Sequence, residues 1–405
     1  MATFIPGEWD KVASRGNIRV YPSSFPQLEA YHSVLPLRRS IVEVCRLWNK
    51  IGTNLLYASF HSKYPNPEKP SYRLAAFAHV LVACPHLGRL VKRLSVWWSP
   101  TITDNELIIR HCPNAIIISA WRINLRYPGS PWIRSLPESI RTLEAGASGV
   151  ETADLMRILY SLPNLESLRL WDFGFVDERC FSQYPHLRFP ALTQLILEFN
   201  DRNPKPIKSW VPILSNLDAP RLTAFETNIG KLESAVSSCP RDIWERLTFL
   251  GAYWKGYRYI KSTYLLNLQH LHLYVEENQT LPKLRQHFPF HQLEIMTLSL
   301  MHMRFVHVTE WETYFQQLMA FPLDTQMMPS LRVLELDWCI GSLEAFVKRL
   351  ESHKDVMSKF LITLGPLAVQ LEKRGVRFIE VHGFDVYHTP TLMQDVVAAC
   401  KRQLL

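Results

Sequence analysis

A six-residue pattern, with apolar residues at its first, fourth and sixth positions, recurs along most of the chain and constrains the fold more than any other feature. Clear copies occupy residues 165–170, 192–197 and 331–336. The copies begin at Val91, Ala115, Ile140, Leu165, Leu192, Leu222, Leu247, Leu268, Ile295, Leu331 and Val376. Spacings lie between 21 and 30 residues for the first nine copies and lengthen to 36 and 45 for the last two. A recurrence of this kind indicates one strand per repeat.

Between several copies the apolar residues change to helical spacing, as in segments 154–162, 232–239, 311–318 and 343–350. A proline commonly precedes the next strand, where it ends the helix and turns the chain. Such a unit cannot bury its apolar face alone, but stacked units share one continuous core. The period is close to that of a leucine-rich repeat. We therefore predict an α/β, leucine-rich-repeat-like solenoid, right-handed, with parallel strands on its concave face and helices on its convex face.

The two ends of the chain differ from the repeats. We expect a poorly defined amino-terminal segment over 1–24 and a small helical segment over 25–60, whose main helix covers 37–55 after Pro36. A proline-rich linker follows over 61–70, and a helix over 71–83 opens the solenoid, which extends over 71–405. A terminal helix over 390–403 is expected to cap the last strand.

Composition narrows the classes of protein. The 405 residues exceed the roughly 250–300 that one compact core accommodates, so several domains or a solenoid are required. The net charge of +8 is modest for this length and is attributed first to solubility. Neither a signal peptide nor an apolar run of membrane-spanning length is present, which predicts an intracellular protein of the cytoplasm, the nucleus or both. The seven cysteines form no close pairs, so we expect small buried thiols and no disulfide framework or zinc site.

No motif for chemistry stands in the sequence. Close glycines for a phosphate loop, a nucleophile elbow and zinc-protease spacing are all missing, so we predict no enzymatic activity, no cofactor and no metal. His270 and His272 alternate along one predicted strand, where plain surface residues are a better interpretation than a metal pair. The segment Tyr253–Lys261 interleaves aromatic and basic residues. Single-stranded nucleic acid is bound by such a mixture, although packing over the solenoid edge is the more ordinary interpretation.

The concave face is the expected ligand surface. Aromatic residues recur at the position after the last apolar residue of the pattern, and acidic residues gather near the carboxy-terminal end. The residues predicted to bind a partner are Trp97, Trp121, Trp171, Tyr253, Tyr274, Glu335, Asp337 and Glu380. Aromatic clusters dominate binding energies, and acidic surfaces favour basic partners. The prediction is a protein target with a basic or aromatic-rich segment; the alternative is that the rings pack beneath connecting loops.

The segment Val44-Cys45-Arg46-Leu47-Trp48-Asn49, followed by Leu55-Leu56-Tyr57, resembles the second half of an F-box. With the repeats that follow, the chain resembles fungal-type F-box proteins with leucine-rich repeats, although the first helix of the F-box is not evident upstream of residue 35. The resemblance implies a substrate-recognition subunit of an SCF-type cullin-RING ubiquitin ligase, with the ligase adaptor and a target protein as partners. Residues implied in adaptor docking or F-box packing are Leu37, Ile41, Val44, Cys45, Trp48, Leu55, Leu56 and Tyr57. The alternatives are a helix that only caps the open end of the solenoid and a repeat scaffold without ligase association.

Overall fold

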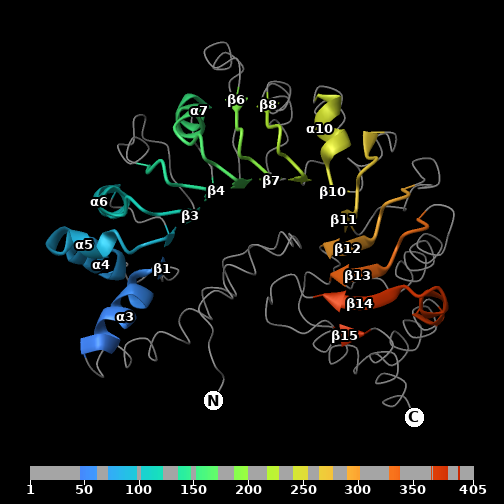
Figure 1. Cartoon of the computed structure of the whole chain (residues 1–405), viewed down its shortest axis with the longest axis horizontal. Helices are drawn as coiled ribbons and strands as arrows, with labels where there is room; N and C mark the ends of the chain where they lie inside the picture. The colour runs from blue at the N-terminus through green and yellow to red at the C-terminus, as the bar shows by residue number, and fades with distance from the viewer. Residues whose placement is uncertain are drawn as a thin grey trace.

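A computed structural model shows the chain as an open arc, with strands along its inner side and helices along its outer side (Figure 1). The structure describes residues 46–61, 72–97, 102–121, 136–146, 152–171, 187–198, 217–227, 240–253, 264–276, 290–301, 328–337, 366, 368–381 and 391–392. The arc is the leucine-rich-repeat-like solenoid that the sequence predicts.

The inner side of the arc is one 13-stranded sheet in which each strand lies beside its sequence neighbour, apart from two short outer strands. All pairings are parallel except that of β14 with the last strand. The strands are β1 (Ser59–His61), β2 (Arg93–Trp97), β3 (Ile117–Trp121), β4 (Thr142–Gly146), β5 (Ser167–Trp171), β7 (Gln194–Glu198), β9 (Ala224–Thr227), β10 (Phe249–Tyr253), β11 (His270–Glu276), β12 (Ile295–Met301), β13 (Val333–Asp337), β14 (Arg377–Val381) and β15 (Thr391–Leu392).

Helices and a small second sheet lie outside this sheet (Figure 1). The helices are α3 (Arg46–Tyr57), α4 (Tyr72–Ala83), α5 (Pro85–Gly88), α6 (Ile102–His111), α7 (Thr152–Tyr160) and α10 (Arg241–Arg246). A further helical stretch covers 368–373. The second sheet pairs β6 (Leu187–Arg188) with β8 (Leu217–Asp218), where two consecutive connections run side by side. The convex side therefore varies from repeat to repeat.

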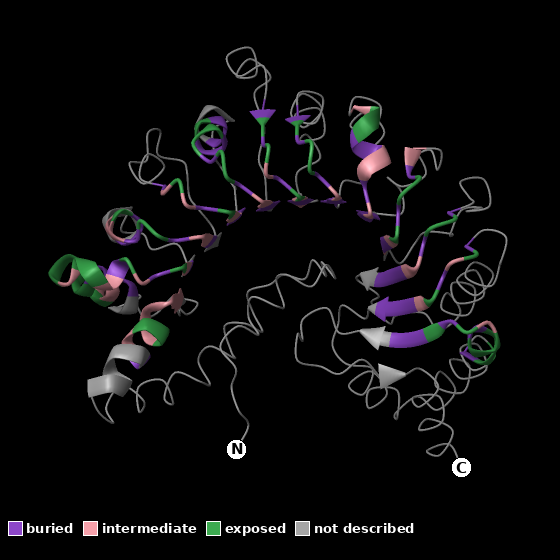
Figure 2. Cartoon of the chain, in the orientation of Figure 1, coloured by how far each residue is buried: buried purple, intermediate pink, exposed green. Residues whose placement is uncertain are grey.

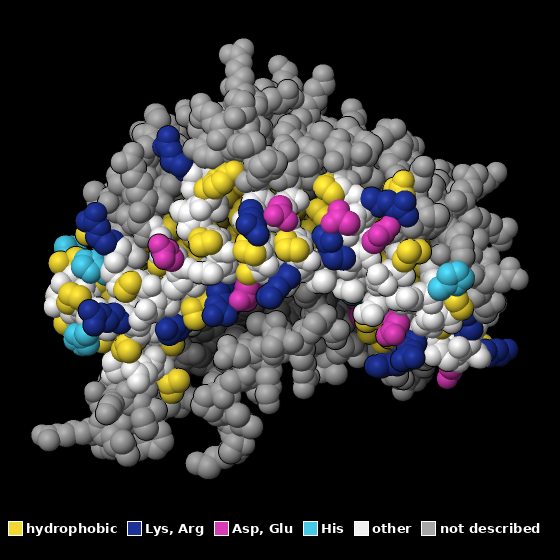
Figure 3. All heavy atoms as spheres, turned by 45° about the horizontal axis from the view of Figure 1, so that its top comes forward, with side chains coloured by type: hydrophobic (Ala, Val, Ile, Leu, Met, Phe, Trp, Pro, Cys, Tyr) yellow, Lys and Arg dark blue, Asp and Glu magenta, His cyan; other side chains and the backbone are white. Residues whose placement is uncertain are grey.

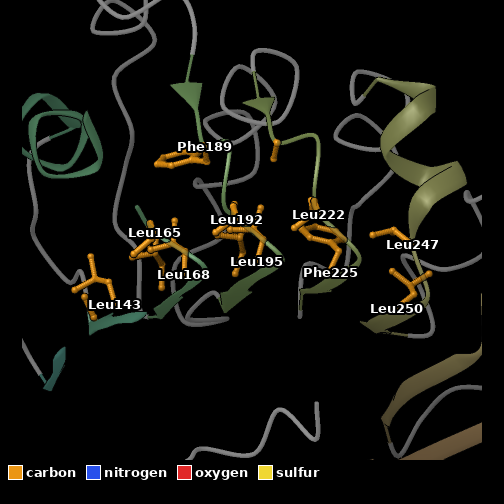
Figure 4. Close-up of a cluster of buried hydrophobic side chains, with 14 of the residues drawn as sticks. Leu143, Leu165, Leu168, Phe189, Leu192, Leu195, Leu222, Phe225, Leu247 and Leu250 are labelled. Carbon is orange, nitrogen blue, oxygen red and sulfur yellow. The ribbon is translucent and has the colours of Figure 1, made fainter. Parts of the chain in front are cut away.

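The core lies between the sheet and these outer elements. The first and second apolar residues of each repeat stack on their counterparts in the next repeat (Figure 4). Leu143, Leu168, Leu195, Phe225 and Leu250 form one such row, and each is no more than 3% exposed. Burial of a leucine or phenylalanine side chain contributes about 1.5–3 kcal/mol, so the stacked rows are the main source of stability. Figure 2 shows buried residues in the inner strands and exposed residues mainly on the outer helices and on the segments that lead into the strands.

Polar side chains join the turns that lead into the strands. The amide of Asn114 donates to the carbonyl oxygen of Arg89 at 2.9 Å, and Asn164 donates to Glu138 O at 3.2 Å. Asn267 repeats the contact with Glu245 O at 2.6 Å. Backbone carbonyls that a turn leaves unpaired are satisfied in this way. The recurrence explains why an asparagine stands in this turn before three of the strands, in two cases directly after a proline.

All eleven predicted strands, and two of the predicted helices of the repeats, are present in the structure. A strand overlaps each of the eleven predicted copies of the pattern. Helices α4 and α7 confirm the helices expected near 71–83 and 154–162. The helices expected at 232–239, 311–318 and 343–350 lie outside the described residues. The terminal helix expected from residue 390 is wrong at its start, because Thr391 and Leu392 form β15, which pairs antiparallel with β14.

The alignment of two late repeats also differs from the prediction. In β12 the register pairs Met296 with Leu271, so the repeat begins at Leu293 and not at Ile295. In β14 the register pairs Phe378 with Leu334 and Glu380 with Leu336. Glu380 therefore lies opposite a core leucine and not in the row of Glu335, where the sequence pattern placed it. Both segments contain extra apolar residues, which fit more than one alignment of the pattern.

The predicted helical segment at the amino-terminal end is described in its second half. The described helix α3 begins at Arg46, and Leu37, Ile41, Val44 and Cys45 lie outside the described residues. Trp48 is part of α3, Leu55 is 39% exposed, and Leu56 and Tyr57 are half-buried. Strand β1 follows α3 directly and pairs with β2. The sheet thus begins before the proline-rich stretch at 61–70.

Candidate functional site

Three rows of side chains run across the concave face of the sheet, because alternate residues of a strand point to the same side. The first row begins each strand and includes Ile117, Gln194 and Ile295. The middle row consists, by register, of Ser95, Ser119, Glu144, Arg169, Ile196, Glu226, Gly251, His272, Thr297, Glu335 and Ile379. The third row includes Trp97, Trp121, Gly146, Trp171, Glu198, Tyr253, Tyr274, Ser299 and Asp337. The first and middle rows differ in accessibility.

The middle row is polar and yet buried. Seven of its polar members are at most 5% exposed: Ser95, Ser119, Arg169, Glu226, His272, Thr297 and Glu335. A buried polar group destabilises the fold unless it is hydrogen-bonded. Members of the same row on adjacent strands supply partners: Ser119 Oγ donates to Glu144 Oε2 at 2.6 Å, and Thr297 Oγ1 donates to Glu335 Oε2 at 2.7 Å. The row is therefore a fixed polar network and not a set of independent surface side chains.

Arg169 is the buried cation of this network. Its Nη2 lies 2.5 Å from Glu198 Oε1, and its Nε donates to the same oxygen at 3.1 Å. The Arg169 side chain is 6% exposed and that of Glu198 is 31% exposed. Burial alone would lower the pKa of Arg169, but the carboxylates of Glu198, Glu144 and Glu226 raise it above its usual value. The guanidinium therefore remains charged and holds three acidic residues from neighbouring strands around one centre.

Glu226 lies beside this cation on β9 and is 2% exposed. Its Oε1 accepts a hydrogen bond from the Tyr274 hydroxyl, which reaches it from β11 across the intervening strand β10. The residue of β10 at this register is Gly251, where a Cβ atom would lie 2.6 Å from Glu226 Cγ. A glycine at 251 is therefore required for Glu226 to occupy its position. The other carboxyl oxygen, Oε2, is buried without a hydrogen-bond partner.

The charge of Glu226 depends on pH near neutrality. Burial, which outweighs the opposing Tyr274 hydrogen bond and Arg169 charge, raises its pKa to about 8. Between the usual value of 4.5 and about 8, the folded protein keeps a proton that the unfolded chain releases. The contribution of Glu226 to stability is therefore full below pH 4.5, decreases as the pH rises toward 8, and changes little above that.

Glu226→Gln is expected to remove this pH dependence, because glutamine is neutral and its amide oxygen can still accept from Tyr274. The natural chain should lose stability relative to the variant by at most about 1.4 kcal/mol per pH unit between pH 5.5 and 8. Urea denaturation of both proteins across this range measures the difference, in which the other titrating groups cancel. A difference in unfolding free energy that stays constant with pH would contradict the assignment.

A second set of hydrogen bonds joins β11 to β13. His270 Nε2 lies 2.8 Å from Thr297 Oγ1, and His272 Nε2 lies 2.6 Å from Ser299 Oγ. Because the Thr297 hydroxyl donates to Glu335, the His270 ring nitrogen is the donor to Thr297. Both histidines thus take part in hydrogen bonds between adjacent strands of the sheet. Within the described part of the chain, no three His, Cys, Asp or Glu side chains come together as a set of metal ligands.

The register places the predicted aromatic residues as the sequence pattern indicated. Trp97 pairs with Trp121, Trp171 pairs with Gly146 and Glu198, and Tyr253 pairs with Tyr274. Among the predicted partner-binding residues, side-chain contacts are described for two. Tyr274 is half-buried and bonded to Glu226, and Glu335 is 3% exposed and bonded to Thr297. These two side chains position the network, so the accessible surface lies elsewhere.

The first row supplies that accessible surface. Most of its described residues are half-buried: Arg93, Ile117, Thr142, Ser167, Gln194, His270, Ile295 and Val333. It mixes short polar side chains with branched apolar ones, and Ser167 Oγ donates to Gln194 Oε1 at 2.9 Å. A ligand lying across the strands would meet more accessible side chains in this row than in the buried middle row beside it.

Arg169, Glu226 and Gly251 were not singled out from the sequence. A signal was present for Arg169 and Glu226, because each is a charged residue between the second and third apolar residues of its repeat, and for Gly251 because it is a glycine at the same position. Their mutual contacts were not accessible to sequence reasoning, since Glu226 and Tyr274 are 48 residues apart and meet across an intervening strand.

Three other features belong to the scaffold. A cleft of about 400 Å³ on the rim is lined by Lys92, Asn114, Ile116, Ser139, Arg141, Asn164, Glu166 and Ala191. Its asparagines bond to neighbouring turns, and its Arg141 pairs with Glu166 at 3.0 Å.

Cys112 is buried, as expected of a small core residue, and burial raises its pKa to about 12, which keeps the thiol protonated and unreactive. Of the aromatic–basic segment Tyr253–Lys261, residues 254–261 lie outside the described residues.

Comparisons with known proteins add a structural likeness alone. No protein-family model matches the sequence, and no curated protein matches it either. Among solved structures, the leucine-rich repeat-containing protein LegL7 from Legionella pneumophila is 13% identical, with a TM-score of 0.42. The alignment covers 76% of this chain and 97% of that one. None of the described helices is both long and apolar enough to cross a membrane. The assignment of the chain as a leucine-rich-repeat-like solenoid thus rests on its own parallel sheet and repeated core.

Proposed function

We propose that this chain recognises a protein partner on its concave face, as the substrate-recognition subunit of an SCF-type ubiquitin ligase. The observation that carries the proposal is the fixed polar network of the middle row, beside which the first row is more accessible. Extended concave surfaces of this kind are what repeat proteins use for binding. The network holds the backbone and side chains in place before a partner arrives, which reduces the ordering cost of association.

The charge of the network favours a basic target segment. Around Arg169 stand Glu144, Glu198 and Glu226, and Glu335 lies farther along the same row. Glu226 keeps its proton near neutral pH, but the other three carboxyl groups still outnumber the guanidinium. Of these, Glu144 and Glu198 are half-buried, so a partner carrying Lys or Arg is proposed to meet these two. The aromatic residues of the third row, Trp97, Trp121, Trp171 and Tyr253, are proposed to add apolar contacts, with Asp337 as a further acid.

The ligase role rests on the F-box-like segment 25–60, in which Leu37, Ile41, Val44, Cys45, Trp48, Leu55, Leu56 and Tyr57 are proposed to dock the adaptor or to pack the segment. The mechanism would be proximity: one end of the chain holds the ligase while the concave face holds the target. No residue of this chain would act on the target chemically. The work would take place in the cytoplasm or the nucleus.

Co-expression with the ligase adaptor, followed by affinity capture, tests this role. The natural chain is expected to retain the adaptor, and the Leu37→Ala/Trp48→Ala double variant to lose at least tenfold of it, with unchanged helical content by circular dichroism. Val369→Ala is the control, because this exposed valine lies near the other end of the solenoid. Absence of capture by the natural chain would contradict the ligase role and favour a repeat scaffold that acts without a ligase.

A further inference from the structure

Strand β4 has no side chain at its position in the third row of the concave face, because that residue is Gly146. Its neighbour in this row on β5 is Trp171. Its neighbour on β3 is Trp121, because the register that pairs Ala120 with Ala145 continues by one residue. The third row therefore has a gap at β4, with a tryptophan on each side of it. We refer to this position, between Trp121 and Trp171, as the Gly146 gap.

The middle row is accessible at the same strand. Glu144, two residues before Gly146 and on the same side of β4, is half-buried, whereas every other member of the row in the described chain is buried. Its neighbours Ser119 and Arg169, each two residues before a tryptophan, are 2% and 5% exposed. The accessible carboxyl group thus coincides with the gap, where no side chain follows it along the strand.

The charges around Glu144 suit the addition of one cation. Arg169, beside Glu144 in the row, forms an ion pair with Glu198 at 2.5 Å. Burial raises the pKa of Glu226 to about 8, so this third acid is protonated near neutral pH. Glu144 and Glu198 therefore contribute two negative charges against the one positive charge of Arg169. A single positive charge from a ligand would balance the cluster.

Other cations of the described chain stand away from the gap. Those on or directly before strands β2 to β5, besides Arg169, are Lys92, Arg93 and Arg141. The first two belong to β2, which is two strands from β4, and Arg141 pairs with Glu166 at 3.0 Å. On the outer side of the arc, basic and acidic side chains are interspersed (Figure 3). The acidic surplus at Glu144 is thus not offset by these cations.

An arginine side chain fits this combination of groups. Two strand spacings, about 9–10 Å, separate β3 from β5. A flat group between two aromatic faces needs about 7–8 Å, which is two contacts of about 3.5–4.0 Å each. A guanidinium group stacks on aromatic faces and can donate two parallel hydrogen bonds to one carboxylate. An ammonium group is compact and strongly hydrated, so it gains less from such a position.

From the gap, the accessible carboxyl group and the balance of charge, we propose that one arginine of the target protein enters the Gly146 gap, with its guanidinium at Glu144 and between Trp121 and Trp171. The inference rests on the protein recognition proposed for the concave face and names the side chain that this face selects. Ser119 Oγ, which donates to Glu144 Oε2 at 2.6 Å, holds the carboxyl group in place before the arginine arrives.

Saturation-transfer difference NMR, which detects weak ligands, tests the proposal with the full natural chain and three peptides. The first is acetyl-Ser-Gly-Arg-Gly-Ser-amide, and the others carry lysine or citrulline in place of the arginine. The arginine peptide is expected to bind at least fivefold more tightly than the lysine peptide, because only the guanidinium is flat. It should bind at least tenfold more tightly than the citrulline peptide, which keeps a flat group without the charge.

Two variants test the position of the arginine. Gly146→Val places a side chain in the gap, and Trp121→Leu/Trp171→Leu keeps apolar side chains but removes the aromatic faces. Each is expected to weaken binding of the arginine peptide at least tenfold. Tyr160→Leu, at a position 44% exposed on the convex helix α7, should leave it unchanged. Circular dichroism checks that each variant is folded, and the comparison of peptides on the natural chain needs no variant.

Three outcomes would overturn the proposal. Equal binding of the arginine and lysine peptides would do so while leaving recognition of a basic segment intact. An arginine-peptide affinity that either folded gap variant leaves unchanged would place the arginine elsewhere. Absence of binding by all three peptides would also overturn it, and photo-crosslinking from the first row in cells then decides separately whether the concave face binds a protein.

Discussion

Arg169→Met at pH 7 is expected to lower the free energy of unfolding by about 3 kcal/mol, the low end of the range for breaking a buried ion pair. The methionine side chain fills a similar volume, so the loss reports the charge and its hydrogen bonds. Without the guanidinium, Glu198 and Glu144 face each other across the sheet beside Glu226, with no buried cation between them. The effect is at the low end because the side chain of Glu198 is 31% exposed. Urea denaturation followed by circular dichroism measures it.

Arg141→Met is the matched control, one strand away. Arg141 pairs with Glu166 at 3.0 Å, but the two side chains are 59% and 47% exposed. Exposed pairs contribute from about 0 to 1 kcal/mol, because water screens the charges in the folded and unfolded states alike. If the two variants lost equal stability, burial of the Arg169 network would not be the source of its energy.

Gly88→Ala is expected to destabilise the protein by about 3 kcal/mol, the upper end of the range for overpacking. A Cβ atom at position 88 would lie 1.9 Å from the carbonyl oxygen of His111 and 2.9 Å from its carbonyl carbon. These are backbone atoms at the end of α6, which cannot turn aside as a side chain can. Helices α4 and α5 would have to move away from α6, and the core contacts of Leu81 would be lost with them. Thermal and urea denaturation measure the loss.

Gly375→Ala separates this clash from the general effect of replacing a glycine. Gly375 follows the helical stretch 368–373 with φ of +72°, and no atom lies within 4 Å of its added Cβ. The cost there is the left-handed backbone alone, about 1–2 kcal/mol. A Gly88→Ala loss no larger than that of Gly375→Ala would show that α6 accommodates the methyl group. That result would contradict the close packing of Gly88 against the end of α6.

The repeated strands could be predicted because their pattern is local. Leu165, Leu168 and Leu170 form one copy, and each is buried as the pattern requires. The prediction weakened where the sequence fits two alignments. In and just before β12, the pattern is satisfied in more than one way by Leu293, Ile295, Met296, Leu298 and Leu300, and pairing with the neighbouring strand decides the register. Terminal repeats are atypical in solenoids. This accounts for the misaligned prediction at β14, and for the strand β15 where the start of a helix was predicted.

The candidate site could be predicted as a face but not as a network. Strand alternation aligned Tyr274 and Glu335 with the rows in which the strand register has them. It could not show that Tyr274 reaches Glu226 over Gly251, or that Arg169 is surrounded by acids from three other strands. Those contacts depend on side-chain lengths and on a missing Cβ atom in the intervening strand, and they appear when the strands are in register.

Site-specific photo-crosslinking in cells tests the central claim, that the concave face binds a protein partner. A photoreactive residue would replace Gln194 or Ile295, both half-buried members of the first row, and, as the comparison, Tyr160, which is 44% exposed on the convex helix α7. The predicted result is a partner adduct of the same mass from both first-row positions and none from position 160. An adduct from position 160 as abundant as those from the first row, or adducts from position 160 alone, would contradict recognition on the concave face.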